Sequence, residues 1–391
     1  MSSQAQEQTH FRYLQLMYRM LINVEALNMV ESIGNVTRRR TVPIVIPKEP
    51  GSYVIRWVPA ISGEALAHRY QLEIVELAKT KYNECKDCID YWSEQGEFLK
   101  HFDLVEFYSN QCTKGSALKG WECALANIAS DMKSTGRKYA LCDIQCIEMT
   151  IVNNSVVEDI GGFLVTQGPT RRTSCIRFSY LIPTLDAVDV SQLDHQMHVR
   201  SALKAQSLQI MEGVQTPYYV QVASAVYGGN IELDIHCVGC YSNSNGCIEN
   251  SVDLCDQLCK DTNCDKLKEY IKSNCASQCT STIRRRISIE SLRPILEGDF
   301  GAKKSRYNPH SVLELAIALI SDKPIPAPPA TLPLENLLES VKKKIDIYYS
   351  ELNVKSKVVV YVTKDLGGEY YARLKEQVEK TLCGEKKVEE K

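Results

Sequence analysis

The chain has 391 residues and a formal net charge of −2 at pH 7, with 44% hydrophobic and 24% charged residues. This composition is ordinary for a folded protein with one sizeable core and insertions, and it excludes a polycation that binds any polyanion through its overall charge. The first ten residues are polar, and the apolar stretch 14–30 contains Arg19 and Glu25, which argues against a secretory signal and a membrane span. We therefore expect a cytoplasmic protein with no membrane partner.

Strand and helix signals alternate along the first part of the chain. Residues 20–28 and 53–58 alternate apolar and polar side chains well enough to predict two strands. Ser62 is a typical helix N-cap, and apolar residues recur at helical spacing over 64–79, which predicts an amphipathic helix. Residues 83–140 break this pattern, and we interpret them as an insertion.

Strand signals resume after this insertion. The pattern predicts a strand over 145–152 and a hairpin over 163–182. A second hairpin is expected over 218–235, with its turn at 228–230. A Cys-rich insertion follows over 237–283.

The C-terminal part begins with a predicted buried helix over 311–320 and a stiff Pro-rich connector over 323–333. Beyond the connector we expect a helix over 334–350, a strand over 357–362, a Gly-Gly turn and a last helix. The charged residues 384–391 have the composition of a disordered tail.

Strands before and after each of two helices indicate an α+β fold with an RNA-recognition-motif (ferredoxin-like) core and large insertions. The expected parts, in chain order, are the first part of the core (20–82), an insertion (83–140), core strands with a hairpin near 160–180 (141–236), a Cys-rich insertion (237–283), the end of the core (284–322), the connector (323–333), a helix-strand-helix unit (334–383) and the tail (384–391).

Lysine and arginine gather in short segments that also contain Gly, Ser or Thr, although the whole chain is slightly acidic. These segments lie within 28–40, 58–70, 161–174 and 301–306. Cationic groups beside exposed backbone N–H groups and hydroxyls suit an extended phosphate chain. The sequence therefore predicts a local groove that binds a nucleic-acid backbone.

Each basic segment also has a purely structural explanation. Arg38–Arg40 could form a solvated loop, and Ser62–Gly63 could do no more than start a helix. Gly161–Gly162 could serve hairpin geometry alone, and His68 lies beside an apolar stripe, where a structural hydrogen bond is the simpler role. Lys303–Arg306 is the strongest candidate for RNA contact, because it follows a glycine and precedes a buried segment.

Sixteen cysteines are unusual in a cytoplasmic protein. The spacing of Cys85 and Cys88, and of Cys237 and Cys240, also suits zinc. The spacing within the cluster is irregular and His236 is its only histidine, so we favour disulfides and expect no cofactor. The candidate disulfide or zinc residues are Cys237, Cys240, Cys247, Cys255, Cys259, Cys264, Cys275 and Cys279.

A ribonuclease is one alternative, with a histidine as general base. His195 and His198 are the only close pair among seven histidines, and no acid–base constellation surrounds them. We therefore expect no enzymatic activity and no catalytic residue. A scaffold protein stabilised by zinc or disulfides is the other alternative.

Several short sequence motifs of this chain resemble the backbone subunit of archaeal type I-A CRISPR Cascade complexes, and they occur in the same order as in that family. This family is part of the repeat-associated mysterious protein superfamily and includes the CRISPR-associated autoregulators. Related members of this superfamily cleave the guide precursor, so the resemblance makes a guide-precursor-cleaving ribonuclease the form that the enzymatic alternative would take. The likeness covers about residues 20–236 and 295–330, but neither insertion. The matching words lie at 27–40, 59–68, 161–163, 171–174, 180–183, 218–227 and 301–306.

This resemblance implies a subunit that stacks head-to-tail along a CRISPR guide RNA. A hairpin thumb of one copy presses on the guide held by its neighbour, and the hairpin near 160–180 is the segment that fits this thumb. The implied partners are guide RNA, target DNA through the guide, further copies of this chain and other Cascade subunits.

The resemblance also implies which residues contact the guide RNA. They are Asn35, Arg38, Arg39, Arg40, Arg56, Ser62, Gly63, His68, Gly161, Gly162, Arg171, Arg172, Thr173, Ser174, Lys303, Lys304, Ser305 and Arg306.

Overall fold

The protein is represented by a computed structural model. The structure describes residues 11–98, 101–102, 112, 118–136, 141–165, 170–202, 214–243, 246–248, 267, 269–271, 278–302, 304–362, 376 and 378–382.

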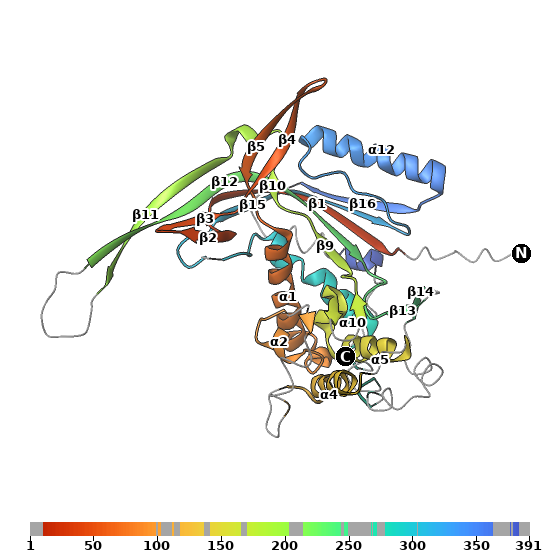
Figure 1. Ribbon diagram of the computed structural model, residues 1–391. Coiled ribbons are helices and arrows are strands. Elements are labelled where there is room, and N and C mark those ends of the chain that lie inside the picture. Colours follow the sequence, from red (N-terminus) through yellow and green to blue (C-terminus); the bar gives the residue numbers. More distant parts are fainter. Residues whose placement is uncertain are drawn as a thin grey trace, which may run out of the picture.

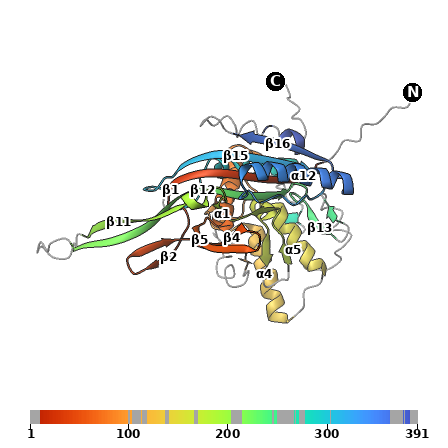
Figure 2. The same cartoon turned by 90° about the horizontal axis from the view of Figure 1, so that it is seen from above.

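A nine-stranded sheet runs through the described part of the chain (Figures 1 and 2). β1 (Tyr13–Glu25) lies at its centre, antiparallel to β12 (Val214–Asp234) on one side and β15 (His310–Ser321) on the other. The remaining strands are β16 (Ser356–Val362) beside β15, and β3 (Val36–Arg39), β2 (Met29–Ile33), β9 (Ile176–Phe178), β10 (Ile182–Pro183) and β11 (Gln192–Ala202) on the β12 side.

The two faces of this sheet are covered by different helices. Alternate residues of β1, including Tyr18 and Met20, pack into a core with Tyr70 and Ile74 of α1 (Gly63–Thr80). Met17 faces the other way and packs with α12 (Leu334–Leu352). The core on the α1 side of the sheet also contains residues of α6 (Val156–Gly161), α10 (Ser281–Glu290) and α11 (Arg293–Leu296).

A helical region with its own apolar cluster lies below α1 (Figure 1). Its main helices are α4 (Gly120–Thr135) and α5 (Leu141–Asn154). The smaller elements of this part of the chain are η1 (Asn83–Cys85), α2 (Tyr91–Glu94), β6 (His101–Phe102), β7 (Phe163–Val165), β8 (Thr170–Arg172), β13 (Tyr241–Asn243) and β14 (Gly246–Ile248).

Two β-ribbons project from the body in different directions (Figure 1). One consists of β4 (Thr41–Glu49) and β5 (Ser52–Pro59), and we call it the first arm. The other consists of β11 and the N-terminal half of β12, and we call it the second arm. A short helix, η2 (Val188–Val190), precedes β11.

The prediction of an α+β fold is confirmed, and the predicted helix over 64–79 is α1. The predicted strand over 53–58 is β5, and the predicted helix and strand near the C-terminal end are α12 and β16. The strand expected over 20–28 begins earlier, because β1 starts at Tyr13. The RNA-recognition-motif core stays a prediction.

The prediction of a strand over 145–152 is wrong, because these residues belong to α5. Buried residues of this helix, such as Ile147 and Ile151, pack with Trp121 and Leu125 of α4. A short apolar run that is covered on most sides has no clear period, so its pattern does not separate a helix from a strand.

The prediction of a helix over 311–320 is also wrong, because this segment forms β15. β15 lies between β1 and β16, and its residues from 315 to 321 are almost all buried. A strand covered on both faces lacks the polar alternation that marks a half-exposed strand.

The predicted turn at 228–230 does not exist, since β12 continues through it as one strand of 21 residues. Gly228 and Gly229 instead allow other groups to approach the strand closely. A Cβ added to Gly228 would lie 2.6 Å from the carbonyl oxygen of Ala330, and one added to Gly229 would lie 2.3 Å from Leu181 Cδ2. Glycine in a strand commonly marks such a close approach.

The described residues near 160–180 do not project as a thumb, which corrects this prediction for residues 160–165 and 170–180. β7 and β8 form a hairpin, but Phe163 and Val165 of β7 and Arg172 of β8 are buried against the helical region. The projecting ribbons are the first and second arms (Figure 1).

Several predictions lie wholly or mainly outside the described residues. These are most of the Cys-rich insertion 237–283, the Gly-Gly turn, most of the last helix and the tail 384–391. Among the described helices, none combines the length and the hydropathy that a membrane crossing requires.

Candidate nucleic-acid interface

Three separate basic segments meet at one groove. The groove has a volume of ≈ 740 Å³ and lies at the N-terminal end of α1. We call it the basic groove. Its polar lining residues are Asn28, Arg40, Ser62, Glu64, His68, Arg69, Asp299 and Lys304. Arg40, Ser62, His68 and Lys304 were expected at the site from the sequence.

Asn28 holds two of these segments together. Its side-chain oxygen accepts hydrogen bonds from Arg40 Nε, at 3.0 Å, and from the backbone N–H of Ser62, at 2.9 Å. The backbone N–H of Arg40 donates to the Asn28 carbonyl at 2.8 Å. These bonds hold the Arg40 guanidinium close to the start of α1.

Ser62 acts as the N-cap of α1. Its hydroxyl oxygen accepts a hydrogen bond from the Ala65 N–H at 3.3 Å, and the residue is buried. The capping role expected of Ser62 is therefore confirmed. The positive end of the helix dipole points at the groove, where it favours an anion.

Gly301, Ala302 and Lys304 of the 301–306 segment also line the groove. The Ala302 N–H donates to the Leu27 carbonyl at 3.0 Å, and Gly301 has a φ of +84°. A Cβ at Gly301 would lie 2.7 Å from Leu27 Cβ, so only glycine fits this close approach without a shift.

Asp299 pairs with two of the cations of the basic groove. Asp299 forms ion pairs with Lys304 and with Arg69, the latter at 3.1 Å. Partial burial raises the pKa of Asp299, but the hydrogen bonds from Lys304 and Arg69 outweigh it and hold the pKa below its ordinary value. The Lys304 ammonium is thereby held at the groove.

Arg39 does not reach the basic groove, so its expected role as an RNA contact is corrected. Its guanidinium is buried, forms an ion pair with Glu25 and donates to Tyr227 Oη at 3.1 Å. Successive side chains of a strand point to opposite faces, which places Arg39 in the core and leaves Arg38 exposed. Arg38 pairs with Glu31 of β2 at 3.0 Å.

Asn35 and Arg56 lie on other parts of the surface. Asn35 is in the β2–β3 turn, where its side chain donates to the Pro217 carbonyl at 3.3 Å. Arg56 is on the first arm and forms an ion pair with Asp189. Neither residue lines the basic groove.

Arg172 is not an exposed gripping charge, which corrects its predicted role. It is buried and forms ion pairs with Asp159, at 2.6 Å, and with Glu148, at 3.4 Å. Arg284 pairs with the same Asp159 at 2.9 Å. We call these four residues the Asp159 cluster. Arg171, the next residue, is exposed.

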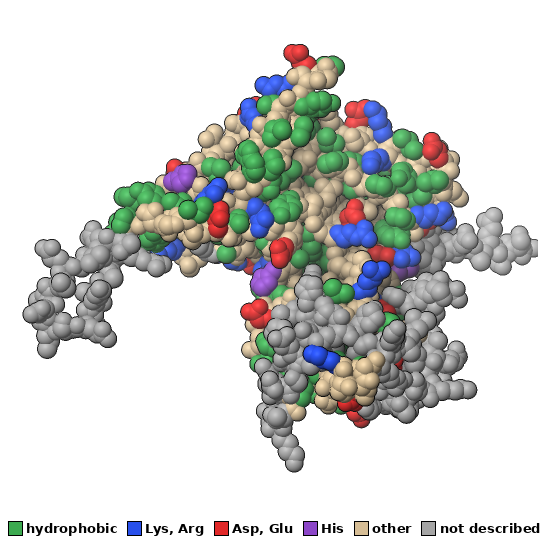
Figure 3. All heavy atoms as spheres, viewed as in Figure 1, with side chains coloured by type: hydrophobic (Ala, Val, Ile, Leu, Met, Phe, Trp, Pro, Cys, Tyr) green, Lys and Arg blue, Asp and Glu red, His purple; other side chains and the backbone are tan. Residues whose placement is uncertain are grey.

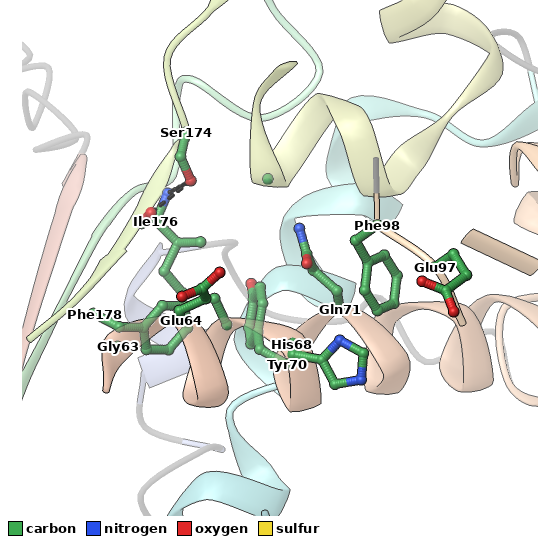
Figure 4. A pocket seen from close by; sticks show the side chains of 12 residues that line it. Gly63, Glu64, His68, Tyr70, Gln71, Glu97, Phe98, Ser174, Ile176 and Phe178 are labelled. Atoms are coloured by element: carbon green, nitrogen blue, oxygen red, sulfur yellow. Dashed lines mark hydrogen bonds between the residues drawn. The ribbon is translucent and has the colours of Figure 1, made fainter. Parts of the chain in front are cut away.

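A second cavity of ≈ 600 Å³ lies along another side of α1 (Figure 4). It is lined by Gly63, His68, Gly161 and Ser174, among others. The His68 ring makes an edge contact with Phe98, with ring centroids 5.2 Å apart. The described residues that line this cavity include Glu64 and Glu97 but no lysine or arginine, so this lining does not suit a phosphate chain.

The remaining predicted residues are scattered. Gly162 follows the end of α6, and Thr173 lines a different cavity beside Arg177 and Asp234. Arg306 donates to Tyr218 Oη at 3.3 Å, and Ser305 is exposed beside it. Lys303 lies outside the described residues.

Disulfides tie the Cys-rich segment to the core. The structure pairs Cys237 with Cys175 and Cys279 with Cys85, and Cys112 with Cys123 in the helical region. Cys88, Cys146 and Cys240 are also disulfide-bonded. The side chains of Cys247, Cys255, Cys259, Cys264 and Cys275 lie outside the described part. Among the described residues, no cluster of His, Cys, Asp or Glu could hold a metal ion.

Sequence reasoning missed four polar residues of the basic groove: Asn28, Glu64, Arg69 and Asp299. Asn28 lies inside one of the quoted words, next to Leu27, but an uncharged amide gave no signal of its own. Arg69 follows His68 and pairs with Glu73 at helical spacing, which could have drawn attention to it.

Comparison with known proteins places this chain in a family. Residues 16–342 match the family model of the CRISPR-associated negative auto-regulator DevR/Csa2. The CRISPR-associated protein Cas7/Csa2 1 of Saccharolobus solfataricus is 31% identical over 352 residues, which span 90% of this chain and 92% of that protein. The CRISPR-associated aCascade subunit Cas7/Csa2 2 of the same organism is 31% identical over 314 residues, 80% of each chain.

Among solved structures, a chain of a CRISPR RNA-guided surveillance complex, pre-nicking, aligns with a TM-score of 0.45 at 13% identity. The alignment covers 94% of this chain and 100% of that one, and a likeness this distant carries no argument about the fold. The match to the family model and the two relatives are sufficient without it: the chain belongs to the CRISPR-associated DevR/Csa2 family.

Proposed function

We propose that this chain is a non-catalytic guide-RNA-binding backbone subunit of a Cascade-type CRISPR surveillance complex of type I-A, located in the cytoplasm. Its partners are guide RNA, target DNA through the guide, further copies of itself in a head-to-tail filament, and other Cascade subunits. The observation that carries the proposal is the meeting of three separate segments at the basic groove.

The basic groove offers the groups that a phosphate chain requires. Arg40 and Lys304 supply cationic side chains, and α1 adds its positive end between them. Contacts from such groups to phosphate carry no sequence information. The protein would then hold the backbone of the RNA and leave sequence reading to base pairing.

The names of the relatives support the same role. One relative carries the name of an aCascade subunit, and both carry CRISPR-associated names. The relatives and this chain align over most of their lengths, so the proposal concerns the whole chain.

Two measurements test this proposal. The first is to extract and sequence the RNA that copurifies with the protein, where we expect RNAs with repeat-derived ends and diverse spacers of unchanged length. The second is salt-dependent binding of a short guide RNA by the double variant Arg40→Ala, Lys304→Ala.

For the double variant we expect affinity to fall by on the order of tenfold at moderate salt, and the slope of log K against log salt to fall by about 2, because two phosphate contacts are lost. The matched control is Lys343→Ala. Lys343 is an exposed lysine of α12 that forms an ion pair with Glu339, one turn earlier in the same helix. Equal binding by the two variants would contradict the groove assignment, and shortening of added RNA would favour the ribonuclease.

A further inference from the structure

A third cavity lies at the end of the sheet where β1 begins and β12 ends, and we call it the strand-end cavity. Its volume is ≈ 430 Å³, which is within the range of sites for small molecules, about 300–1,000 Å³. The lining residues that carry the argument below are Tyr13, Gln15, Arg177, Glu232, Asp234 and the disulfide-bonded pair Cys175 and Cys237.

Two cross-strand rows supply the polar side chains of the strand-end cavity. In one row Gln15 of β1 lies opposite Glu232 of β12, which lies opposite Arg177 of β9. In the next row Tyr13 lies opposite Asp234. Residues directly opposite each other project from the same face of a sheet, so these five side chains share one face.

Gln15 has a polar atom that the described residues leave unsatisfied. The residue is only 5% exposed, and its Oε1 has no hydrogen-bond partner among them. A buried polar atom without a partner costs free energy, and a bound group can remove this cost. A ligand with an N–H donor would therefore be stabilised beside Gln15.

Charges of both signs surround this amide. Arg177 is 71% exposed at its side chain and pairs with Glu232 at 3.3 Å, while Asp234 pairs with Arg12 at 2.6 Å. Figure 3 shows basic and acidic side chains mixed over the surface around the start of β1. A guanidinium suits a carboxylate, and carboxylates suit an ammonium group, so the lining fits a zwitterion.

The Cys175–Cys237 disulfide forms part of the same lining. Cys175 is 4% exposed, whereas Cys237 is partly exposed, so Cys237 is the more accessible of the two. The Cys85–Cys279 disulfide is closed to solvent, because its cysteines are 0% and 1% exposed. A small molecule in the strand-end cavity can therefore reach one disulfide and not the other.

A buried guanidinium stands next to both sulfur atoms of the accessible disulfide. Arg172 Nη2 lies 3.8 Å from Cys175 Sγ and 4.0 Å from Cys237 Sγ, and the ion pair with Asp159 holds it there. A neighbouring cation favours a thiolate, and thiol–disulfide exchange is faster when the departing sulfur is a stable thiolate. Arg172 thus favours departure of the buried Cys175 sulfur.

We propose that the strand-end cavity binds a small zwitterionic thiol, a cysteine or a short cysteine-containing peptide, which exchanges with the disulfide at Cys237. The ligand thiol loses its proton to solvent, and its sulfur forms a bond to Cys237 Sγ. The Cys175–Cys237 bond breaks, and its electron pair remains on Cys175 as a thiolate, so the ligand sulfur is oxidised as Cys175 is reduced.

This exchange opens the stretch of chain that carries the second arm, because β11 and β12 lie between the two cysteines. The inference does not depend on RNA binding.

Thiol exchange on the full-length oxidised protein tests the proposal. The probes are reduced glutathione, L-cysteine and the uncharged 2-mercaptoethanol, each at low concentration with early acid quenching. Dividing each rate by the rate of the same thiol with an unstructured peptide disulfide removes differences in intrinsic nucleophilicity. Alkylation and peptide mass mapping then locate the adduct and the released thiol.

We expect the thiol adduct on Cys237, the alkyl group on Cys175 and neither on Cys85 or Cys279. The better zwitterionic thiol should react about tenfold faster than 2-mercaptoethanol after normalisation, because charge-assisted hydrogen bonds hold it in the cavity. The ratio of the glutathione and cysteine rates tells whether the peptide or the free amino acid fits better.

Two variants test the lining, with circular dichroism to confirm that each is folded. Arg177→Gln and Gln15→Met should each remove most of the advantage of the zwitterionic thiol and leave the 2-mercaptoethanol rate within about twofold. The matched control is Arg38→Gln, since Arg38 is another exposed arginine with a carboxylate partner and lies outside this cavity. Local unfolding would instead raise the rate of every thiol, so this readout separates binding from stability.

Equal normalised rates for the three thiols would overturn the inference. An adduct on Cys175 with Cys237 alkylated would also overturn it, as would the same loss of selectivity in Arg38→Gln. A folded protein whose disulfide resists all three probes and yields only to a protein dithiol would exclude a small-thiol site.

Discussion

The basic groove and the Asp159 cluster both contain an arginine from a basic segment of the sequence, but one arginine lies at an open groove and the other is buried. Each draws on arginine placed close to Gly and Ser, at Arg40 and at Arg172. Arg40 lies at an open groove and is fixed by the neutral Asn28, whereas Arg172 is buried between two carboxylates. The comparison shows that the partner of an arginine, and not its neighbours in the sequence, decides whether its charge remains available to a ligand.

The two regions also differ in what they connect. The Asp159 cluster joins α5, α6, β8 and α10, and the Asp159 carboxylate also accepts a hydrogen bond from the Gly239 N–H at 2.9 Å. It therefore links the core, the helical region and the start of the Cys-rich segment. Asp299 in the basic groove, by contrast, pairs with side chains at a partly exposed surface.

The largest expected effect comes from Arg172→Ala compared with Arg171→Ala. Loss of Arg172 leaves Glu148 without this buried ion pair, and we expect the free energy of unfolding to fall by about 3–5 kcal/mol. Loss of the exposed Arg171 should change it by no more than about 0.5 kcal/mol. Chemical denaturation of both variants measures the difference.

RNA binding by the folded fraction completes this test. A folded, stable Arg172→Ala variant with weakened RNA binding would break the comparison, because it would restore Arg172 as an RNA contact.

A smaller effect is expected from loss of the Cys175–Cys237 disulfide, which closes a loop next to the Asp159 cluster. Replacement of both cysteines by serine should cost about 2–4 kcal/mol of stability, because the unfolded chain gains conformational freedom. RNA affinity should not change, since neither cysteine lines the basic groove. Thermal melting with and without a reducing agent measures the stability, and RNA titration measures the affinity. A change in affinity without a change in melting temperature would contradict the prediction.

The smallest effect is expected at Asp299. Its pKa is lower in the folded protein than its ordinary value of 3.8, so its stabilisation is fully present above that value and is lost as the pH falls through the depressed pKa. Because the carboxylate is half exposed, the contribution should not exceed about 1 kcal/mol.

Asp299→Asn removes this charge at neutral pH. We expect RNA affinity to rise a few-fold at low salt and the difference to shrink at high salt, because a negative charge leaves the basic groove. Titrations at two salt concentrations measure it. A fall in affinity would show that Asp299 is needed chiefly to hold Lys304 in place.

Local signals in the sequence were sufficient for elements whose stability is mainly local. The Ser62 cap and the apolar spacing over 64–79 predicted α1, and a helix was also expected over 334–350, where α12 lies. These helices keep one face exposed, so their period remains visible in the sequence.

The wrong predictions concern segments that are covered on several sides. α5 and β15 have similar apolar runs, and only their neighbours, α4 in one case and the strands β1 and β16 in the other, decide between helix and strand. The same is true of Gly228 and Gly229, where contact with a distant part of the chain, and not a turn, accounts for the glycines.

The sequence by itself determined the family, the α+β class, the amphipathic helices and the presence of basic segments, because these depend on composition, local spacing and short words. Only the tertiary structure decided which basic residues are available. It brought Arg40, α1 and Lys304 to one groove and buried Arg39 and Arg172 against Glu25 and Asp159. The physical reason is that the energy of a charge depends on the partners and the solvent around it, and residues far away in the sequence supply them.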